Sequence, residues 1–291
     1  MAEIAITAEK DVVRPVQINA RRLAAGAGWA VDEVVCSCGP VDRPYDEQHD
    51  DVVIALVTGG TFQYRGSGSN GREMMTPGSI LLGSPGQAFA CGHEHSIGDR
   101  CLSFRFAPEY FATIADGTPA CDRRRVFRSL RLPPIASLSP VVADACAALA
   151  AANEPAWEEI GVRVAAHVLH ADAALDPDPR AITSNMISRV TRTVRMIEAH
   201  PAGDLTTIRL AREAGLSPFH FLRTFAKVTG VTPHKYILRM RLRHAATMLA
   251  AGSNRILDVA LDAGFGDVSN FNHAFRGEFG VSPRRYRQRR S

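Results

Sequence analysis

Short apolar runs broken by turn residues fill the first part of the chain. Between about residues 31 and 106, runs such as DEVVCSC, VVIALV and RCLSFRF alternate with the turn-forming stretches GSGSNG, TPG and SPG. Several short strands at this spacing are typical of an antiparallel sheet that closes as a barrel or stacks as a sandwich. We therefore expect an antiparallel β barrel within residues 1–139.

From Pro140 the apolar positions follow helical spacing instead, in SPVVADACAALAAAN and PAWEEIGVRVAAHVLHADAAL. The second of these segments places five apolar residues on one stripe: Trp157, Ile160, Val164, Val168 and Leu169. Such a stripe is too long for a lone surface helix, so residues 140–175 are predicted to be a helical segment through which the protein forms a homodimer.

The sequence DPDPR at residues 176–180 cannot continue a helix, because proline lacks a backbone N–H and restricts the residue before it. It predicts a linker over residues 176–183, after which the pattern is helical to the end. The predicted fold class is therefore a two-domain α+β protein, in which residues 184–291 form an all-α domain.

An internal repeat organises this all-α part. The phrase GVTPHKY at residues 230–236 recurs as GVSPRRY at residues 280–286. Further upstream, two alanines and a glycine recur after 49 residues and two phenylalanines recur after 50: Ala211, Ala214, Gly215, Phe221 and Phe225 correspond to Ala260, Ala263, Gly264, Phe271 and Phe275. One residue inserted after the glycine explains the change of offset, because a turn tolerates an insertion.

Each copy meets the physical requirements of a helix-turn-helix unit. Gly215 and Gly264 can end a first helix in the left-handed conformation, and phenylalanines at helical spacing anchor a second helix by one face. About 18 helical residues, roughly 27 Å, separate the two copies. This length predicts two recognition helices that enter successive major grooves, about 34 Å apart on one face of duplex DNA.

Charge divides the chain in the same place. Residues 180–291 contain 19 Lys and Arg against 7 Asp and Glu, a net charge of +12, whereas residues 1–179 carry −8 and the whole chain +4. Phosphates attract an arginine-rich surface and repel an acidic one. The C-terminal part alone is therefore expected to bind nucleic acid, with Arg239, Arg241, Arg243 and the tail RRYRQRR exposed to solvent or in contact with phosphate.

The segments LTTIRLAREAGLSPFHFLRTFAKVTGVTPHKYILRMRLRHAATML and ILDVALDAGFGDVSNFNHAFRGEFGVSPRRYR resemble the DNA-binding domain of AraC/XylS-type transcription regulators, which begins here with a helix at residues 184–199. The resemblance implies a cupin-like sensor domain at residues 1–139, dimerising helices at 140–175, and two helix-turn-helix units in 184–291. It also implies a regulator of transcription that binds double-stranded DNA, responds to a small-molecule or ion effector and contacts RNA polymerase. We expect an activator, with repression as the alternative, because no residue identifies the direction of regulation.

By the same resemblance, Phe219, Leu222 and Arg223 occupy base-facing positions of the first recognition helix. The offset of 50 residues adds Ser269, Asn272 and His273 in the second helix. Arginine suits guanine, asparagine suits adenine, and an apolar side chain suits the thymine methyl group. Lys227 and Arg276 lie one helical turn further along, where the DNA backbone is the nearer partner.

The motif ACGHEHSIGDRC places Cys91, His93 and His95 at alternate positions, so on a strand all three would share one face, as would Cys36 and Cys38. Thiolate and imidazole together suit zinc or another ion of similar softness. No cofactor other than such an ion is expected. Packing, an organic effector pocket and thiol redox sensing remain the alternatives for these residues.

Two functions compete with that of a non-enzymatic regulator. The first is a metal-binding cupin-type enzyme fused to a DNA-binding domain, although the glutamate and further histidine that usually follow HxH are missing. The second is an alkyl-transfer DNA-repair regulator, although its four-cysteine zinc module and Pro-Cys-His-Arg motif are also missing. The polar start of the chain and the shortness of VVIALV predict a cytoplasmic protein with no membrane partner, whose six cysteines are thiols.

Overall fold

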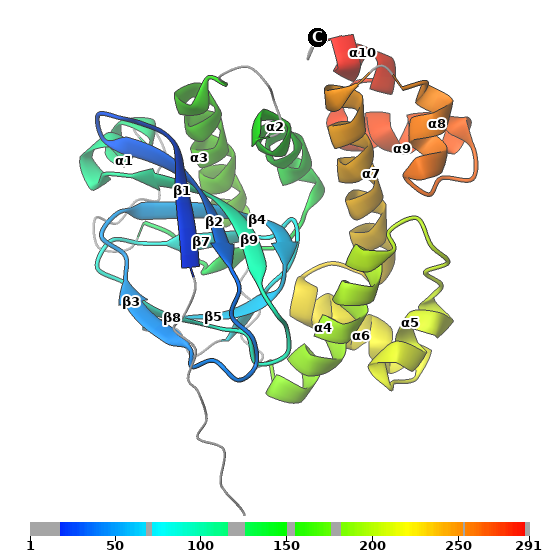
Figure 1. Ribbon diagram of the computed structural model, residues 1–291, viewed down its shortest axis with the longest axis horizontal. Coiled ribbons are helices and arrows are strands. Elements are labelled where there is room, and N and C mark those ends of the chain that lie inside the picture. Colours follow the sequence, from blue (N-terminus) through cyan, green and yellow to red (C-terminus); the bar gives the residue numbers. More distant parts are fainter. Residues whose placement is uncertain are drawn as a thin grey trace, which may run out of the picture.

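The computed structural model describes residues 18–67, 72–115, 126–149, 155–175, 182–252 and 254–288. A β-rich part and an all-helical part lie side by side (Figure 1), which confirms the predicted two-part α+β architecture. The predicted linker lies largely outside the described residues, as do the first 17 residues and the end of the basic tail. No helix among the described residues is long and apolar enough to cross a membrane.

The strands form two antiparallel sheets, and neither closes into a barrel within the described residues. The larger sheet has the order β1-β2-β9-β4-β7-β10, with β1 (Ile18–Gly26), β2 (Trp29–Cys36), β9 (Asp99–Phe106), β4 (Val52–Gly60), β7 (Ile80–Gly83) and β10 (Arg131–Leu132). The smaller sheet has the order β3-β8-β5-β6, with β3 (Tyr45–Gln48), β8 (Ala88–Gly92), β5 (Phe62–Gly66) and β6 (Glu73–Met75). Of the barrel and the sandwich that the turn spacing allows, the chain adopts the sandwich-like arrangement.

Alternation along β4 builds one core on each face of the larger sheet. Ile54 and Leu56 are fully buried under the helices, whereas Ala55 and Val57 point into the space between the two sheets. Successive side chains of a strand point to opposite faces, so a strand covered on both faces reads as a continuous apolar run. This explains the run VVIALV as a buried central strand.

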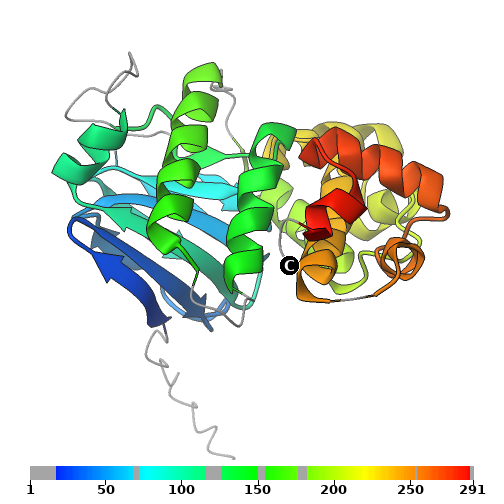
Figure 2. The ribbon, with the colours of Figure 1, turned by 90° about the horizontal axis from the view of Figure 1, so that it is seen from above.

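Helices α1 (Pro108–Ala115), α2 (Ser139–Leu149) and α3 (Trp157–Ala174), with the short helix η1 (Ala136–Leu138), complete the β-rich part. Figure 2 shows α2 and α3 next to each other over the larger sheet. The apolar stripe of α3 packs against this sheet, where Val164 and Val168 are fully buried. Since the stripe is covered within its own chain, it gives no support to the predicted homodimer, which stays a prediction.

The helical part consists of α4 (Ser184–Ala199), α5 (Thr207–Ala214), α6 (Pro218–Thr229), α7 (Pro233–Ala251), α8 (Ile256–Asp262), α9 (Val268–Phe279) and α10 (Pro283–Gln288). The helix expected at residues 184–199 is confirmed as α4. Helix α7 is 19 residues long, which corresponds to about 28 Å. It carries α4–α6 near one end and α8–α10 near the other (Figure 1).

The β-rich part packs directly against the first helix-turn-helix unit. Met74 of β6 is fully buried in a core with Val190, Phe225 and Tyr236. Polar contacts surround it: Arg131 donates to the Thr229 carbonyl at 2.9 Å, and the Gly60 N–H donates to the α4 side chain of Glu198 at 2.7 Å. The two parts therefore share both an apolar core and a hydrogen-bonded rim.

Candidate nucleic-acid interface and N-terminal cavity

Helix α6 is fixed by one apolar face and by its two ends. Phe221, Phe225 and Val228 are fully buried. Ser217 caps the N-terminus by accepting from the His220 N–H at 3.4 Å, and Gly230 ends the helix at φ 80°, a conformation that costs other residues strain. The opposite face is left exposed to solvent.

Helix α9 is built in the same way. Phe271, Phe275 and Phe279 are buried and contact one another with tilted rings, and Tyr286 of α10 packs against the last two rings. The side chain of Asp267 caps the helix by accepting from the Asn270 N–H at 2.7 Å. The repeated phrase in the sequence thus corresponds to a repeated arrangement of cap, aromatic anchor and glycine stop.

The two helices expose most of the predicted DNA-contacting side chains. Seven of the eight are exposed: Phe219, Leu222 and Arg223 on α6, and Ser269, Asn272, His273 and Arg276 on α9. Lys227 is half-buried. The Arg223 guanidinium carbon lies 5.7 Å from the centre of the Phe219 ring, a cation–π contact that holds the arginine on the outer face.

Three arginines of α7 that we expected at the surface point into the protein instead. Arg239 pairs with Glu278 at 3.0 Å, Arg241 donates to the Pro201 and Gly203 carbonyls, and Arg243 donates to the Pro77 carbonyl at 3.1 Å. Burial lowers the pKa of Arg241 and of Arg243. These side chains hold the structure together rather than offer charge to a phosphate.

Two other basic residues lie in a better position: Lys235, which sequence reasoning passed over, and Arg285, which belongs to the tail RRYRQRR that we expected at the surface or at a phosphate. Lys235 and Arg285 occupy the same place in the two repeats, in the first turn of α7 and of α10, and both are exposed. The repeated phrase itself was the signal, because it places a basic residue two positions after the proline in each copy.

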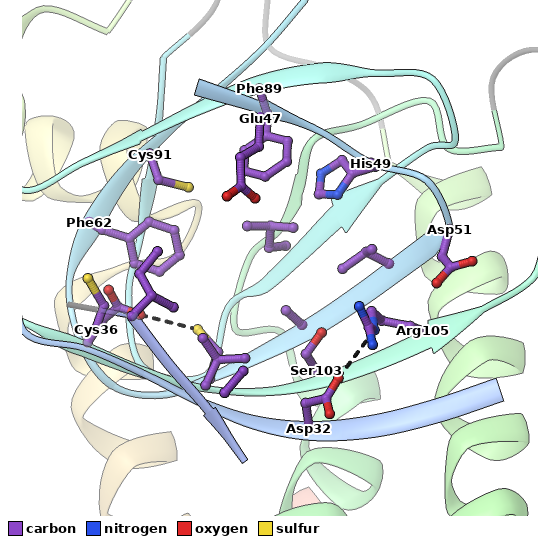
Figure 3. A pocket seen from close by; sticks show the side chains of 18 of the residues that line it. Asp32, Cys36, Glu47, His49, Asp51, Phe62, Phe89, Cys91, Ser103 and Arg105 are labelled. Atoms are coloured by element: carbon purple, nitrogen blue, oxygen red, sulfur yellow. Dashed lines mark hydrogen bonds and ion pairs between the residues drawn. The ribbon is translucent and has the colours of Figure 1, made fainter. Parts of the chain in front are cut away.

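A cavity of about 400 Å³ lies between the two sheets (Figure 3). Val34, Leu81, Phe62 and Phe89 are among its apolar walls, and its charged groups include Asp32, Glu47, Asp51 and Arg105. Arg105 Nε lies 3.2 Å from Asp32 Oδ2, but it is buried without a hydrogen bond of good geometry. The cavity therefore combines apolar walls with a few charged groups, as small-molecule sites do.

His49 adds a neutral polar group to this cavity. Its Nε2 lies 2.8 Å from the Tyr64 hydroxyl, and its ring stacks on Phe89 at 4.1 Å between centroids. Burial lowers the pKa of His49 to about 4, while the charge of Asp50 acts in the opposite direction. The imidazole is therefore neutral at physiological pH.

A cluster of sulfur and nitrogen atoms lies at the end of the cavity near α4. Cys36 ends β2, Cys38 follows it, and His93 comes just after β8. One potential ligand atom from each lies within 4.8 Å of the other two, and all three residues are buried. Burial raises the pKa of the Cys36 thiol to about 12, with the backbone hydrogen bond of Cys38 acting in the opposite direction. Without an ion, Cys36 is thus a protonated and unreactive thiol.

The three metal ligands predicted from the sequence do not come together. Strand β8 ends at Gly92, so His93 and His95 do not continue the alternation that begins at Cys91. His95 lies 3.1 Å from the Ser184 hydroxyl of α4, whereas His93 turns inward to Asp99 at 2.7 Å. Only His93 belongs to the cluster, together with the two cysteines of the CSC motif.

Two helix-turn-helix units on a shared helix, with exposed polar and basic recognition faces, define a DNA-binding domain. Residues 210–289 match the family model described as a helix-turn-helix domain. The chain is 34% identical over 107 residues to the transcriptional activator RhaS of Klebsiella pneumoniae (37% of this chain, 38% of the relative). It is 37% identical over 90 residues to the probable transcriptional regulator LumQ of Photobacterium leiognathi (31% and 36%). The C-terminal helical domain belongs to the AraC type.

The matches to these curated relatives span little more than a third of each relative's length and about a third of this chain. Among solved structures, an AraC-type regulator from Chromobacterium violaceum matches 38% of this chain and 97% of its own, with 29% identity and a TM-score of 0.35. Fatty-acid-bound ToxT from Vibrio cholerae matches 90% of this chain and 95% of its own, at 11% identity and a TM-score of 0.36.

Proposed function

We propose that this protein is a sequence-specific DNA-binding transcription regulator whose N-terminal part senses a small molecule or ion. The observation that carries the proposal is the duplicated recognition helix. In both copies an aromatic face is buried and the opposite face is exposed, and both copies are mounted on one helix of about 28 Å. This arrangement suits two successive major grooves, about 34 Å apart.

The exposed side chains divide into base-reading and phosphate-binding sets. Arg223 can donate two hydrogen bonds to guanine and Asn272 can make the matching pair with adenine, each worth about 1–3 kcal/mol of discrimination. Phe219 offers an apolar surface to a thymine methyl group. Arg276, Lys235 and Arg285 lie where a phosphate can pair with them, so they add affinity without sequence preference.

The cavity between the sheets supports the sensing part of the proposal. Glu47, Asp50 and Asp51 are among the residues that line it, while the charge of Asp32 is matched by Arg22 and Arg105. Glu47, Asp50 and Asp51 form no ion pair with another residue that the structure describes, and carboxylates of this kind attract cations. A small effector with a positively charged amine therefore fits this cavity better than a carboxylate does. Thermal-shift assays with amine and carboxylate metabolites test this, because a native-state binder raises the melting temperature.

Activation of transcription through RNA polymerase belongs to the same proposal, since RhaS is named a transcriptional activator and resembles this chain in the DNA-binding domain. Neither the cupin-type enzyme nor the alkyl-transfer regulator is favoured by a specific feature of the described residues. A homodimer would add a second copy of the bipartite DNA contact. Light scattering of the full-length protein with and without DNA measures that assembly directly.

The test is selection of genomic DNA fragments by the purified full-length protein. We expect recovery of particular promoter fragments over bulk DNA, with an affinity that falls steeply as salt rises, because neutralised phosphates release counterions. The double variant Arg223→Ala, Asn272→Ala should retain only weak, non-selective binding. Recovery of bulk fragments alone by the unaltered protein would contradict sequence-specific regulation.

A further inference from the structure

We propose that Cys36, Cys38 and His93 form a binding site for a zinc ion at the end of the cavity next to the DNA-binding domain. The three residues come from segments that are far apart in the sequence, yet their potential ligand atoms lie within 4.8 Å of one another. Two thiolates and an imidazole form a donor set that zinc prefers over hard oxygen-binding ions such as magnesium and calcium.

The distances require little movement. Around a tetrahedral zinc ion with bonds of about 2.3 Å to sulfur and 2.0–2.1 Å to nitrogen, neighbouring ligand atoms are about 3.5–3.8 Å apart. The potential ligand atoms of the three residues lie within 4.8 Å of one another, which exceeds this separation by only about 1 Å. Rotation of the side chains can close that difference. The cluster is therefore preformed, not assembled from distant positions.

The backbone around the cluster is held in place by short-range contacts. Cys36 is paired with Asp99 across β2 and β9, and the Gly98 N–H donates to the Cys38 carbonyl at 2.8 Å. Gly98 has φ 67°, and a Cβ atom there would lie 2.9 Å from the Cys36 carbonyl oxygen. Only glycine fits this close approach without strain. The segment 36–38 is thus fixed against the loop that follows His93.

Asp99 orients the imidazole. His93 Nε2 lies 2.7 Å from Asp99 Oδ2, and both side chains are more than nine-tenths buried. A carboxylate that accepts from one ring nitrogen leaves the other as the lone-pair donor, the arrangement usual for histidines that bind zinc. Asp99 is therefore a positioning residue for the proposed site.

The site has a free side toward the cavity. Cys36, His93 and Asp99 line the cavity wall, whereas three protein ligands leave one position of a tetrahedral ion for water or another small molecule. The segment that contains Asp99 also lies close to α4. Asp99 is paired with Gly60 in the larger sheet, and the Gly60 N–H donates to Glu198 of α4. Bound zinc would therefore lie at the junction of the cavity and the DNA-binding domain.

Zinc content tests the proposal. Full-length protein without a metal-binding tag is reduced, incubated with Zn²⁺, passed through a desalting column and analysed by mass spectrometry of the elements. We expect about one zinc per chain, as for a single site of this donor set. Cys38→Ser and His93→Asn should each lose most of it, whereas the matched controls Cys146→Ser and His95→Asn should retain it.

A second readout separates loss of a ligand from loss of the fold. Co²⁺ bound by thiolates absorbs in the near ultraviolet, so the band should appear with the unaltered protein and disappear in Cys38→Ser, while circular dichroism stays the same. Asp99→Asn should weaken zinc binding about 10- to 100-fold in chelator competition, the usual effect of losing such a partner.

Three results would overturn the proposal. One is fewer than about one zinc in ten chains of the reduced, folded protein, far below the single ion per chain that the site would hold. Another is a disulfide between Cys36 and Cys38 in freshly purified protein, which would assign the pair to redox chemistry. The third is equal loss of zinc in His95→Asn and His93→Asn. That result would favour the ligands predicted from the sequence, which are Cys91, His93 and His95. None of these outcomes affects the proposed binding of DNA.

Discussion

Arg239 of α7 and Glu278 of α9 form an ion pair, with 3.0 Å between Nε and Oε1, and both side chains are close to nine-tenths buried. The same carboxylate accepts from the Ser139 hydroxyl of α2, and Arg239 also donates to the Pro134 carbonyl at 2.8 Å. One buried pair therefore joins the second helix-turn-helix unit both to the shared helix and to the β-rich part.

We expect Glu278→Ala to lower the free energy of unfolding by about 3 kcal/mol, because it leaves the buried guanidinium without a countercharge. Denaturant titrations followed by circular dichroism measure the change. Glu213→Ala, an exposed position on α5, is the control and should stay within about 0.5 kcal/mol of the unaltered protein. An equally small effect of Glu278→Ala would show that the pair contributes little.

Two glycines near the end of α9 predict opposite effects of one added methyl group. Gly277 lies inside the helix and Gly280 ends it at φ 71°, and a Cβ atom at either position would meet nothing within 4 Å. Gly277→Ala should therefore stabilise the protein by about 0.5–1 kcal/mol. Gly280→Ala should destabilise it by about 1–2 kcal/mol. Thermal unfolding of the two variants side by side checks this, and effects of the same sign would contradict it.

Stability should fall as the pH drops below about 6.5, the ordinary pKa of histidine. His49 has a pKa of about 4 in the folded protein, so between these values the unfolded chain binds more protons than the folded one. The neutral imidazole thus contributes stability above pH 6.5 that is lost as the pH falls toward 4, about 2 kcal/mol of it by pH 5. Unfolding free energies at pH 7 and pH 5 measure the loss. Between pH 7 and pH 5 the His49→Gln variant should lose about 2 kcal/mol less unfolding free energy than the unaltered protein. An unchanged loss would assign the pH dependence to other groups.

Arg276→Ala should weaken binding to all DNA sequences alike and reduce the slope of log affinity against log salt by about 0.9, the contribution of one phosphate contact. Arg276 is a better choice for this test than Lys227, because its side chain is exposed and that of Lys227 is half-buried. Arg163→Ala on α3 replaces an exposed arginine of the β-rich part and should leave both quantities unchanged. A loss of affinity only for DNA that carries particular base pairs would instead make Arg276 a base-reading residue.

The helix-turn-helix units were predictable because their determinants are local. Alanines, glycines and phenylalanines at fixed spacing specify which face of each helix is buried and where it ends, and the repeat states the pattern twice. The structure confirms these elements, with α4 at the expected residues. The net positive charge of the domain could also be predicted from the sequence. Which of its arginines are exposed and which point into the protein could not.

Features that depend on contacts between distant segments could not be read from the sequence. Arg243 looks exposed in a basic helix, yet α7 packs on the loop at Pro77 and leaves this side chain partly buried. His93 and His95 look equivalent on a strand, but β8 ends before them. The pairing of Cys36 with Asp99, which brings His93 to the two cysteines, depends on the register of β2 against β9. No local pattern encodes that register.

The central claim is that α6 and α9 read DNA one helical turn apart. Selection from a random duplex library by the full-length protein tests it most directly, with Arg223→Ala and Asn272→Ala selected in parallel. We predict a bipartite motif whose two conserved parts are about 10–10.5 base pairs apart. Arg223→Ala should erase preference in one part and Asn272→Ala in the other. A single conserved part, or loss of the same base pair in both variants, would contradict the account.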